Sequence, residues 1–234
     1  MRQIKCYILW KINKFAAKEK TKMGPMEIKS EIRWFDVVES TNDEVRKHIS
    51  ELDNLSVIAA EYQTKGRGQG DHKWHSRSGE NLTFTVALKF GGDSQLQPLD
   101  VKDSLLITEV TTLALRLYLA DKGIEARIKW PNDIYVGDKK ICGMLIENIL
   151  DKSQVSASIV GIGLNINQTE FPADLPNPTS VKLLTGRDYS TREELELFCS
   201  YLAECALKTN TAEGRRYLDD IFNQYMFRLD AKPE

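Results

Sequence analysis

Residues 129–147 decide the fold of this chain, and they read KWPNDIYVGDKKICGMLIE. The β-prone residues 134–136 and 141–146 flank Gly137 and Asp138, a pair that is typical of a tight turn between two strands. The pattern therefore predicts a β-hairpin, which the neighbouring β-prone segments extend into a larger sheet.

Lys140 stands out within this hairpin. Strict alternation along the second arm puts it on the same face as Cys142 and Met144. An ammonium group beside apolar surface is costly unless an anion meets it, so a phosphate or a carboxylate-derived group is its natural partner. A turn-flanking surface lysine is the alternative for Lys140 taken alone. Two polar segments, residues 40–42 and 63–74, have the composition of ligand-binding loops and favour the functional interpretation.

Several blocks of sequence carry a resemblance to a known family, the biotin–protein ligases. In chain order they are Glu39-Ser40-Thr41-Asn42, Gln63-Thr64-Lys65-Gly66-Arg67-Gly68, Lys129-Trp130-Pro131-Asn132-Asp133, Lys140 with Gly143, and Gly161-Ile162-Gly163-Leu164-Asn165-Ile166-Asn167. Together they extend over about residues 31–226. One block alone is weak, but five in the family's order and at plausible spacings are hard to obtain by chance.

The composition sets broad limits on function. A chain of 234 residues is long enough for one domain with a substantial core. Its net charge of −2 gives no bulk electrostatic reason to bind nucleic acid or an anionic membrane. The cysteines contain no Cys-x-x-Cys pair, and the histidines have no metal-ligand spacing. We therefore expect reduced thiols, a cytoplasmic location, no resident metal, and neither a nucleic-acid nor a membrane partner.

The N-terminal residues 1–29 are expected to form a basic tail or extension. Its apolar run at residues 6–10 is too short for a signal peptide. A partly helical tail, a surface-associating segment, and an extension upstream of a start at Met23 or Met26 remain open. The segment is also too short for the winged helix-turn-helix that repressor-type members of the family carry, so DNA binding is not expected.

The remaining periodicities predict an α+β fold, a mixed β-sheet with packed helices, in one catalytic domain over residues 30–228. We expect strands at residues 32–38, 55–61, 81–90, 124–130, 134–136, 141–146 and 155–165, and helices from about residue 40 and at 101–121, 191–206 and 214–226. Alternation in residues 81–90 predicts a half-buried strand. Thr191 and Glu194 form a capping-box pattern. Residues 168–180, with three prolines, are expected to form a loop.

The segment from Gly66 to Trp74 invites a nucleotide-binding interpretation, but two standard motifs fail. No Gly-x-x-x-x-Gly-Lys-Ser/Thr is present, and the glycines do not open a helix. The remaining interpretation is a flexible loop whose backbone N–H groups wrap an anion, with the Arg67 guanidinium as a further, charged donor. A Gly-rich hairpin with an exposed arginine is the alternative. The resemblance implies that this loop covers biotin and biotinyl-5′-AMP; the family's second basic position is Gln69 here, which removes one positive charge.

The resemblance also implies the chemistry. Biotin and ATP are the substrates, Mg²⁺ arrives with ATP, and biotinyl-AMP passes its acyl group to a lysine of a biotin carboxyl carrier protein or biotinyl domain. Lys140 is the expected catalytic residue, assisted by Arg67. The expected biotin site comprises Ser40, Thr41, Asn42, Gln63, Gly66, Arg67, Gly68, Gln69, Lys140, Gly143, Gly161 and Gly163. The expected ATP and adenylate site comprises Trp74, Asn132, Asp133 and Asn165.

Some of these residues also have structural explanations. Ser40 and Thr41 could serve only as helix N-caps, and Trp74 could be plain core. Trp130 and Pro131 are assigned to packing. The glycines are expected to let the backbone approach the ligand closely.

Rival functions remain open at the level of the sequence. A lipoate or octanoate ligase shares the acyl-adenylate chemistry but binds a longer, ureido-free acid. A non-catalytic biotin-binding remnant is the other rival. The resemblance implies a small C-terminal β-barrel, which we expect to be absent because residues 227–234 leave no room for it, and the charge usual at Gln69 is also lost. A homodimer formed through the sheet is compatible with the resemblance.

Overall fold

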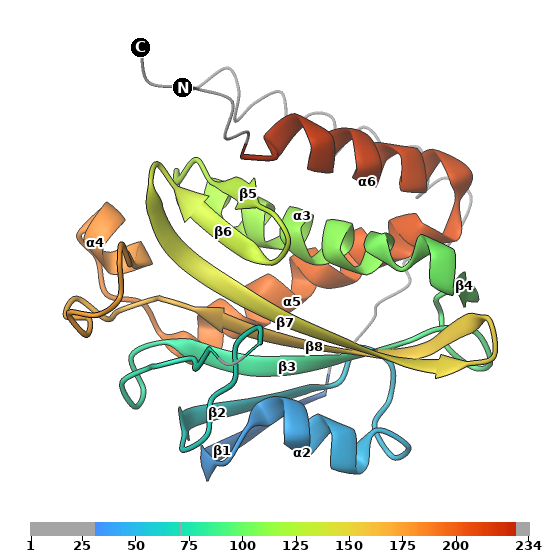
Figure 1. Cartoon of the computed structure of the whole chain (residues 1–234), viewed down its shortest axis with the longest axis horizontal. Coiled ribbons are helices and arrows are strands. Elements are labelled where there is room, and N and C mark those ends of the chain that lie inside the picture. The colour runs from blue at the N-terminus through green and yellow to red at the C-terminus, as the bar shows by residue number, and fades with distance from the viewer. Residues whose placement is uncertain (1–30, 71, 228–234) are drawn as a thin grey trace.

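One mixed β-sheet organises the part of the chain that the computed structural model describes, residues 31–70 and 72–227 (Figure 1). Its order is β1-β2-β3-β8-β7-β6-β5, and β4 pairs with β8. The strands are β1 (Ile32–Val38), β2 (Val57–Gln63), β3 (Leu82–Lys89), β4 (Leu99–Asp100), β5 (Arg127–Lys129), β6 (Asp133–Val136), β7 (Lys139–Asp151) and β8 (Gln154–Leu164). The tail or extension expected over residues 1–29 lies outside the described residues.

The pairing directions follow from the connections. β1 and β2 are parallel because a helix, α2 (Thr41–His48), carries the chain back between them. The other strand pairs of this sheet are antiparallel. The predicted hairpin is confirmed: β6 and β7 pair around Gly137, whose φ of +60° suits a residue without a Cβ.

A β-bulge in this hairpin overturns the predicted face of Lys140. Ile134 pairs with Cys142 while Tyr135 pairs with Lys140, so Ile141 is an extra residue on β7. The extra residue shifts the alternation by one position, and Lys140 moves to the face of Gly143. A Cβ built on Gly143 would lie 3.2 Å from Lys140 Nζ. The prediction that Lys140 shares a face with Cys142 and Met144 is therefore wrong.

Four longer helices and three short helical elements complete the fold of the described residues. On one face of the sheet lie α3 (Leu105–Asp121) and α5 (Thr191–Leu207), with α6 (Ala212–Tyr225) packed against α3 (Figure 1). Helix α2 packs on the other face, over β2, β3 and β8. A short helix, α4 (Val181–Thr185), follows the proline-containing loop. The expected α+β architecture is thus the one observed.

Strand β3 is buried on both faces, not half-buried as its alternation predicts. Its apolar positions Phe84 and Val86 face α3 and α5, while the threonines of the other face bond to the neighbouring strand β2 (Thr83) and to α2 (Thr85). These threonines are hydrogen-bonded: Thr83 Oγ1 donates to the Ala60 carbonyl at 2.7 Å, and Thr85 Oγ1 donates to Asn42 Oδ1 at 2.7 Å. A polar residue with such partners can be buried, and alternation alone cannot reveal that.

Two helix starts differ from the prediction. The N-cap of α5 is Ser190, whose hydroxyl accepts the Glu193 amide, so the predicted capping box of Thr191 and Glu194 is wrong. The Glu194 carboxylate is engaged elsewhere, accepting the Tyr118 hydroxyl at 2.5 Å. The helix predicted over residues 101–121 begins instead with a short 3₁₀ turn, Val101–Asp103, before α3.

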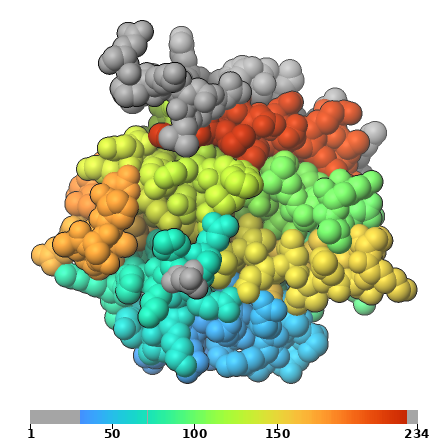
Figure 2. Space-filling view, in the orientation of Figure 1, coloured from blue at the N-terminus to red at the C-terminus, as the bar shows by residue number. Residues whose placement is uncertain are grey.

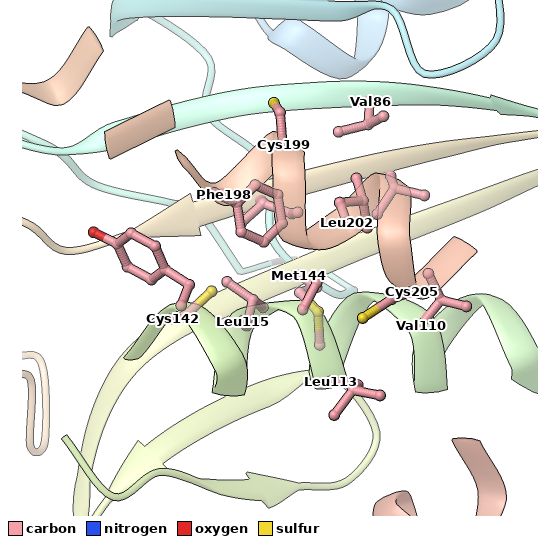
Figure 3. Packing of buried hydrophobic residues seen from close by; sticks show 14 of the residues in the cluster. Val86, Val110, Leu113, Leu115, Cys142, Met144, Phe198, Cys199, Leu202 and Cys205 are labelled. Carbon is pink, nitrogen blue, oxygen red and sulfur yellow. The ribbon is translucent and has the colours of Figure 1, made fainter. Parts of the chain in front are cut away.

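The main core lies between the sheet and α3, α5 and α6. Cys142 and Met144 of β7 point into it, toward the helices that carry Leu115 and Phe198 (Figure 3). The rings of Phe84 and Phe198 meet edge to face with centroids 5.3 Å apart. Within the described residues no helix is both long and apolar enough to cross a membrane.

Glu109 on α3 provides a test of this packing. Its side chain is buried, and Oε2 has no hydrogen-bond partner. Burial, with help from the charge of Asp219, raises its pKa from 4.5 to about 7. The folded state therefore holds this proton more tightly than the unfolded state, so its stability falls as the pH rises from about 4.5 to about 7.

We expect Glu109→Gln to stabilise the protein at pH 8 by about 1–3 kcal/mol, because a neutral amide replaces a buried charge. At pH 4 the two proteins should have nearly equal stability. Urea unfolding at both pH values measures the difference. An unchanged pH dependence in the variant would show that Glu109 is not the group that titrates.

Candidate active site

A cavity of about 480 Å³ opens on the α2 side of the sheet, over β6, β7 and β8. Residues 67–69 and 72–74, after β2, and residues 171 and 175–178, before α4, form its walls. In the space-filling view the cyan segment after β2 lies between the yellow-green strands β5 and β6 and the blue helix α2 (Figure 2). The volume is in the range of small-molecule sites.

Nearly all the predicted site residues line this one cavity. They are Ser40, Thr41, Asn42, Gln63, Arg67, Gly68, Gln69, Trp74, Asn132, Asp133, Lys140, Gly143, Gly161, Gly163 and Asn165. Gly66 is the exception among them. It is buried beneath the wall, and its carbonyl accepts the Trp74 amide at 3.1 Å, so it closes the hairpin.

One end of the cavity carries neutral polar groups. Gln63 Oε1 accepts from the Thr41 amide at 2.8 Å and from Thr41 Oγ1 at 3.1 Å, which fixes the Gln63 side chain. Ser40 occupies the N-cap position of α2 but makes no side-chain capping bond. Its hydroxyl, like the Gln63 amide nitrogen, therefore keeps its hydrogen-bonding capacity for a ligand.

Asn42 lies directly on the floor of this end. A Cβ on Gly161 would overlap Asn42 Oδ1, so only glycine fits beneath the amide. Thr85 Oγ1 donates to Asn42 Oδ1, and Asn42 Nδ2 donates to Glu147 Oε2 at 2.8 Å. These bonds fix the amide orientation.

Lys140 marks the other, charged part of the cavity. Its Nζ forms an ion pair with Asp133 Oδ1 at 2.7 Å. The backbone beside it is clamped, since its N–H donates to the Asn177 carbonyl at 2.8 Å and its carbonyl accepts the Thr179 amide at 2.9 Å. The Lys140 ammonium is thus held in a defined place on the cavity wall.

Trp74 covers the glycines beside Lys140. A Cβ on Gly163 would overlap its indole ring, and one on Gly143 would lie 3.2 Å from it. Lys140 Nζ is 6.0 Å from the ring centroid, within reach of a cation–π contact. We expected a ligand to approach the backbone of these glycines directly. In this structure the side chains of Trp74 and Lys140 occupy the space above them.

Residues 66–70 and 72–74 form the two sides of a hairpin, in which the amides of Gly68, His72 and Trp74 donate to carbonyls of the hairpin itself. Gly68 N–H donates to the His72 carbonyl at 2.7 Å and His72 N–H to the Gln69 carbonyl at 3.3 Å. These three amides are used within the hairpin, and the prediction that other N–H groups of the segment wrap an anion stays a prediction. The Arg67 guanidinium is held by carboxylates, at 3.2 Å from Asp43 Oδ1 and 2.7 Å from Glu147 Oε2.

The amides of Asn132 and Asn165 are also used within the protein. Asn132 Nδ2 donates to the Met144 carbonyl at 2.8 Å, and Asn165 Nδ2 donates to the Thr179 carbonyl at 2.9 Å. Each side chain therefore offers its oxygen, more than its nitrogen, to a ligand.

Sequence reasoning missed part of the site. Trp130 is 64 % exposed and lines the cavity together with Pro131, so their assignment to packing is wrong. The wall before α4 was also missed; it comprises Phe171, Leu175, Pro176, Asn177 and Pro178. Apolar residues in a proline-rich loop were the available signal, because a loop without periodicity has little other reason to carry them.

Comparison with known proteins agrees with this arrangement. The family model "Biotin/lipoate A/B protein ligase family" matches residues 34–165, more than half of the chain. The chain belongs to the biotin/lipoate protein ligase family. The matched range includes the polar end of the cavity, the hairpin over it, and Lys140 with Asp133. The resemblance noted in the sequence is thereby confirmed.

Named relatives fall in the same family. The chain is 31 % identical to the bifunctional ligase/repressor BirA of Salmonella typhimurium over 76 % of its own length and 54 % of that relative. It is 30 % identical to the biotin–[acetyl-CoA-carboxylase] ligase of Paracoccus denitrificans, covering 74 % of this chain and 72 % of the relative. The chain spans about half the length of the bifunctional relative.

The fold has solved counterparts. The structure of a biotin protein ligase from Aquifex aeolicus in complex with biotin and ATP matches with a TM-score of 0.68 and 28 % identity, covering 84 % of this chain and 78 % of that one. The mixed sheet with packed helices is therefore the catalytic-domain fold of this family, as expected.

Proposed function

We propose that this chain is an ATP-dependent biotin–protein ligase, with its catalytic domain within residues 30–228. The observation that carries the proposal is the cavity, which joins a neutral polar end to the paired ammonium of Lys140. Relatives named as biotin ligases, and a similar structure in complex with biotin and ATP, support the choice of substrates.

The polar end suits the ureido ring of biotin. That ring needs both donors and acceptors in a largely apolar pocket, and Ser40, Thr41, Asn42 and Gln63 supply them. Each well-made buried bond contributes on the order of 1 kcal/mol. A ureido-free acid such as lipoate would leave these groups unpaired, so the arrangement favours biotin.

In the first step the biotin carboxylate attacks the α-phosphorus of ATP, the acyl phosphate bond forms, and pyrophosphate leaves. Little proton transfer is needed, so positioning and charge neutralisation dominate. Lys140 is the group that meets the developing negative charge on the carboxylate and phosphate oxygens. Arg67 assists by adding positive charge to the cavity wall.

The residues around Lys140 hold the nucleotide. Asn132 orients the triphosphate, which brings Mg²⁺ with it, through its free amide oxygen. Asp133 holds Lys140 until the substrates arrive. Trp74 and Asn165 contribute to the adenylate side of the cavity.

In the second step a lysine amine of a biotin carboxyl carrier protein or biotinyl domain attacks the acyl carbon. The amide bond forms, AMP leaves, and the amine loses a proton. We infer that the reaction takes place in the cytoplasm, and the buried free thiols Cys142, Cys199 and Cys205 support a reducing compartment. A homodimer through the sheet is part of the proposal.

Gln69 offers a test of how the intermediate is kept. It is exposed on the hairpin and lines the cavity. We expect Gln69→Arg to slow the release of bound biotinyl-AMP about threefold to tenfold, because a cation there attracts the phosphate. Release measured by rapid dilution checks this, and an unchanged rate would refute the role given to Gln69.

The proposed function is tested by ATP–pyrophosphate exchange with biotin, lipoate and octanoate in parallel. Exchange with biotin alone supports the proposal. Exchange with lipoate or octanoate would identify the related acyl ligase. Biotin binding without exchange would identify a binding protein that has lost its catalysis.

A further inference from the structure

Glu147 on β7 is a residue that none of the sequence blocks contains, yet it joins several parts of the site. Its Oε2 accepts Asn42 Nδ2 at 2.8 Å and pairs with Arg67 Nη2 at 2.7 Å. Its Oε1 pairs with Arg46 Nη2 at 3.0 Å on the outer side. The carboxylate thereby connects α2, β7 and the hairpin of residues 66–74.

The hydrogen bond between Asn42 and Glu147 fixes the orientation of the Asn42 amide. Thr85 Oγ1 donates to Asn42 Oδ1 at 2.7 Å, so the Asn42 nitrogen must point the other way. There it reaches Glu147 Oε2 at 2.8 Å and the Leu145 carbonyl at the longer distance of 3.3 Å. The Asn42 amide sits against Gly161 with no spare room. Glu147 is thus the stronger acceptor that keeps Asn42 in this orientation.

The bond to Arg67 decides where the hairpin lies. The backbone hydrogen bonds that Gly68, His72 and Trp74 donate stay within the hairpin. Arg67 ties the hairpin to the body of the protein through its ion pairs with Glu147 and Asp43. Trp74, at the end of the same hairpin, covers Gly143 and Gly163. A hairpin released from Glu147 would therefore also loosen the indole over the cavity.

We propose that Glu147 is a positioning residue that seats Asn42 and, through Arg67, the hairpin over the biotin cavity. This inference rests on the proposed function for the nature of the ligand, but the seating itself is a property of the unliganded protein. In this state Arg67 anchors the hairpin over the cavity, and its ion pair with Glu147 holds Arg67 in place.

The charge state of Glu147 agrees with this role. Burial opposes ionisation, but hydrogen bonds from Asn42 and Arg67, and the charges of Arg67 and Arg46, outweigh it and lower the pKa of Glu147. The carboxylate is therefore ionised at neutral pH. Its side chain is 25 % exposed, so the pairs are partly shielded from water and salt.

The test uses Glu147→Gln, Arg67→Gln and the double variant, with Arg46→Gln as a matched control. Arg46 pairs with the other oxygen of the same carboxylate, Oε1, and not with the oxygen that meets Asn42 and Arg67. Two readouts are taken. One is the rate of trypsin cleavage after Arg67 or Lys73 in the unliganded protein (after Lys73 alone where Arg67 is replaced), and the other is the dissociation constant for biotin by calorimetry.

We expect Glu147→Gln to speed cleavage after Lys73 and to raise the biotin dissociation constant, each about tenfold, with an unchanged melting temperature within a few degrees. The double variant should be no worse in hairpin cleavage than Arg67→Gln alone, because Arg67→Gln already breaks the Arg67–Glu147 contact, together with the contact to Asp43. Arg46→Gln should match the wild type in both readouts.

Wild-type behaviour of Glu147→Gln, or cleavage effects of Glu147→Gln and Arg67→Gln that add, would overturn the inference. An equal effect of Arg46→Gln would also overturn the inference. It would show that the effects come from the loss of any charge near Glu147, and not from the loss of the contacts that seat Asn42 and the hairpin. Failure of the proposed function would be seen in a different measurement. A wild-type chain without biotin-dependent exchange would refute the ligase function, and the cleavage measurement would still decide the role of Glu147.

Discussion

Replacing Lys140 with alanine is expected to slow formation of biotinyl-AMP by about two orders of magnitude or more, since loss of one preorganised donor to a developing charge costs about 3 kcal/mol. The structure gives the reason. Lys140 Nζ is held by Asp133 at 2.7 Å, and its backbone is clamped by residues 177–179, so the ammonium is in place before the substrates bind. Biotin-dependent pyrophosphate exchange at saturating substrates measures the effect.

Lys139→Ala is the matched control for this prediction. Lys139 is the neighbouring lysine, exposed at the turn and absent from the cavity wall. The Lys139→Ala variant loses the same charge as Lys140→Ala but leaves the site unchanged, so its exchange rate should equal the wild-type rate. If Lys140→Ala retained near-normal exchange, the central role of this lysine would have to be abandoned.

The second large effect is expected from Gly161→Ala. The new methyl group would overlap Asn42 Oδ1, and Asn42 would have to leave its bonds to Thr85 and Glu147. Loss of one or two buried hydrogen bonds of about 1–1.5 kcal/mol each predicts a biotin dissociation constant about 10- to 100-fold higher. Titration calorimetry with biotin measures it directly.

A double-mutant cycle separates this clash from a general disturbance of β8. In an Asn42→Ala background the amide is gone, so adding Gly161→Ala should change biotin affinity very little. Ser156→Ala, on an exposed position of the same strand, should bind biotin as the wild type does. An equal cost of Gly161→Ala with and without Asn42 would show that another contact is responsible.

Most helices and strands could be predicted from local pattern. Strand β1 matches its prediction in full, and the hairpin of β6 and β7 follows from β-prone runs around Gly137. Strand β2 and strand β5 have shifted bounds, because the ends of strands depend on which neighbours pair with them. The double burial of β3 also depends on tertiary structure, since α2 covers the second face.

The residues of the candidate site also fall into those that the sequence predicts and those that only the tertiary structure reveals. Residue types suited to a ureido ring and a phosphate could be read from blocks of sequence, and they do line one cavity. Trp130 lies within one of these blocks but was assigned to packing, and neither the wall of residues 171 and 175–178 nor Glu147 belongs to a block. Their part in the site comes from contacts between segments that are far apart in the chain, and single-sequence periodicity carries no information on such contacts.

The sequence by itself determined the mixed sheet, the chemistry available to the chain and the family to which it belongs. Only the tertiary structure decided which face Lys140 presents and what holds Arg67. The bulge at Ile141 moves Lys140 from the core face to the cavity face, and the pairing of β7 with β8 brings Glu147 beside Asn42 and Arg67. Register and long-range pairing fix these outcomes, because a shift of one residue in a strand reverses every side chain beyond it.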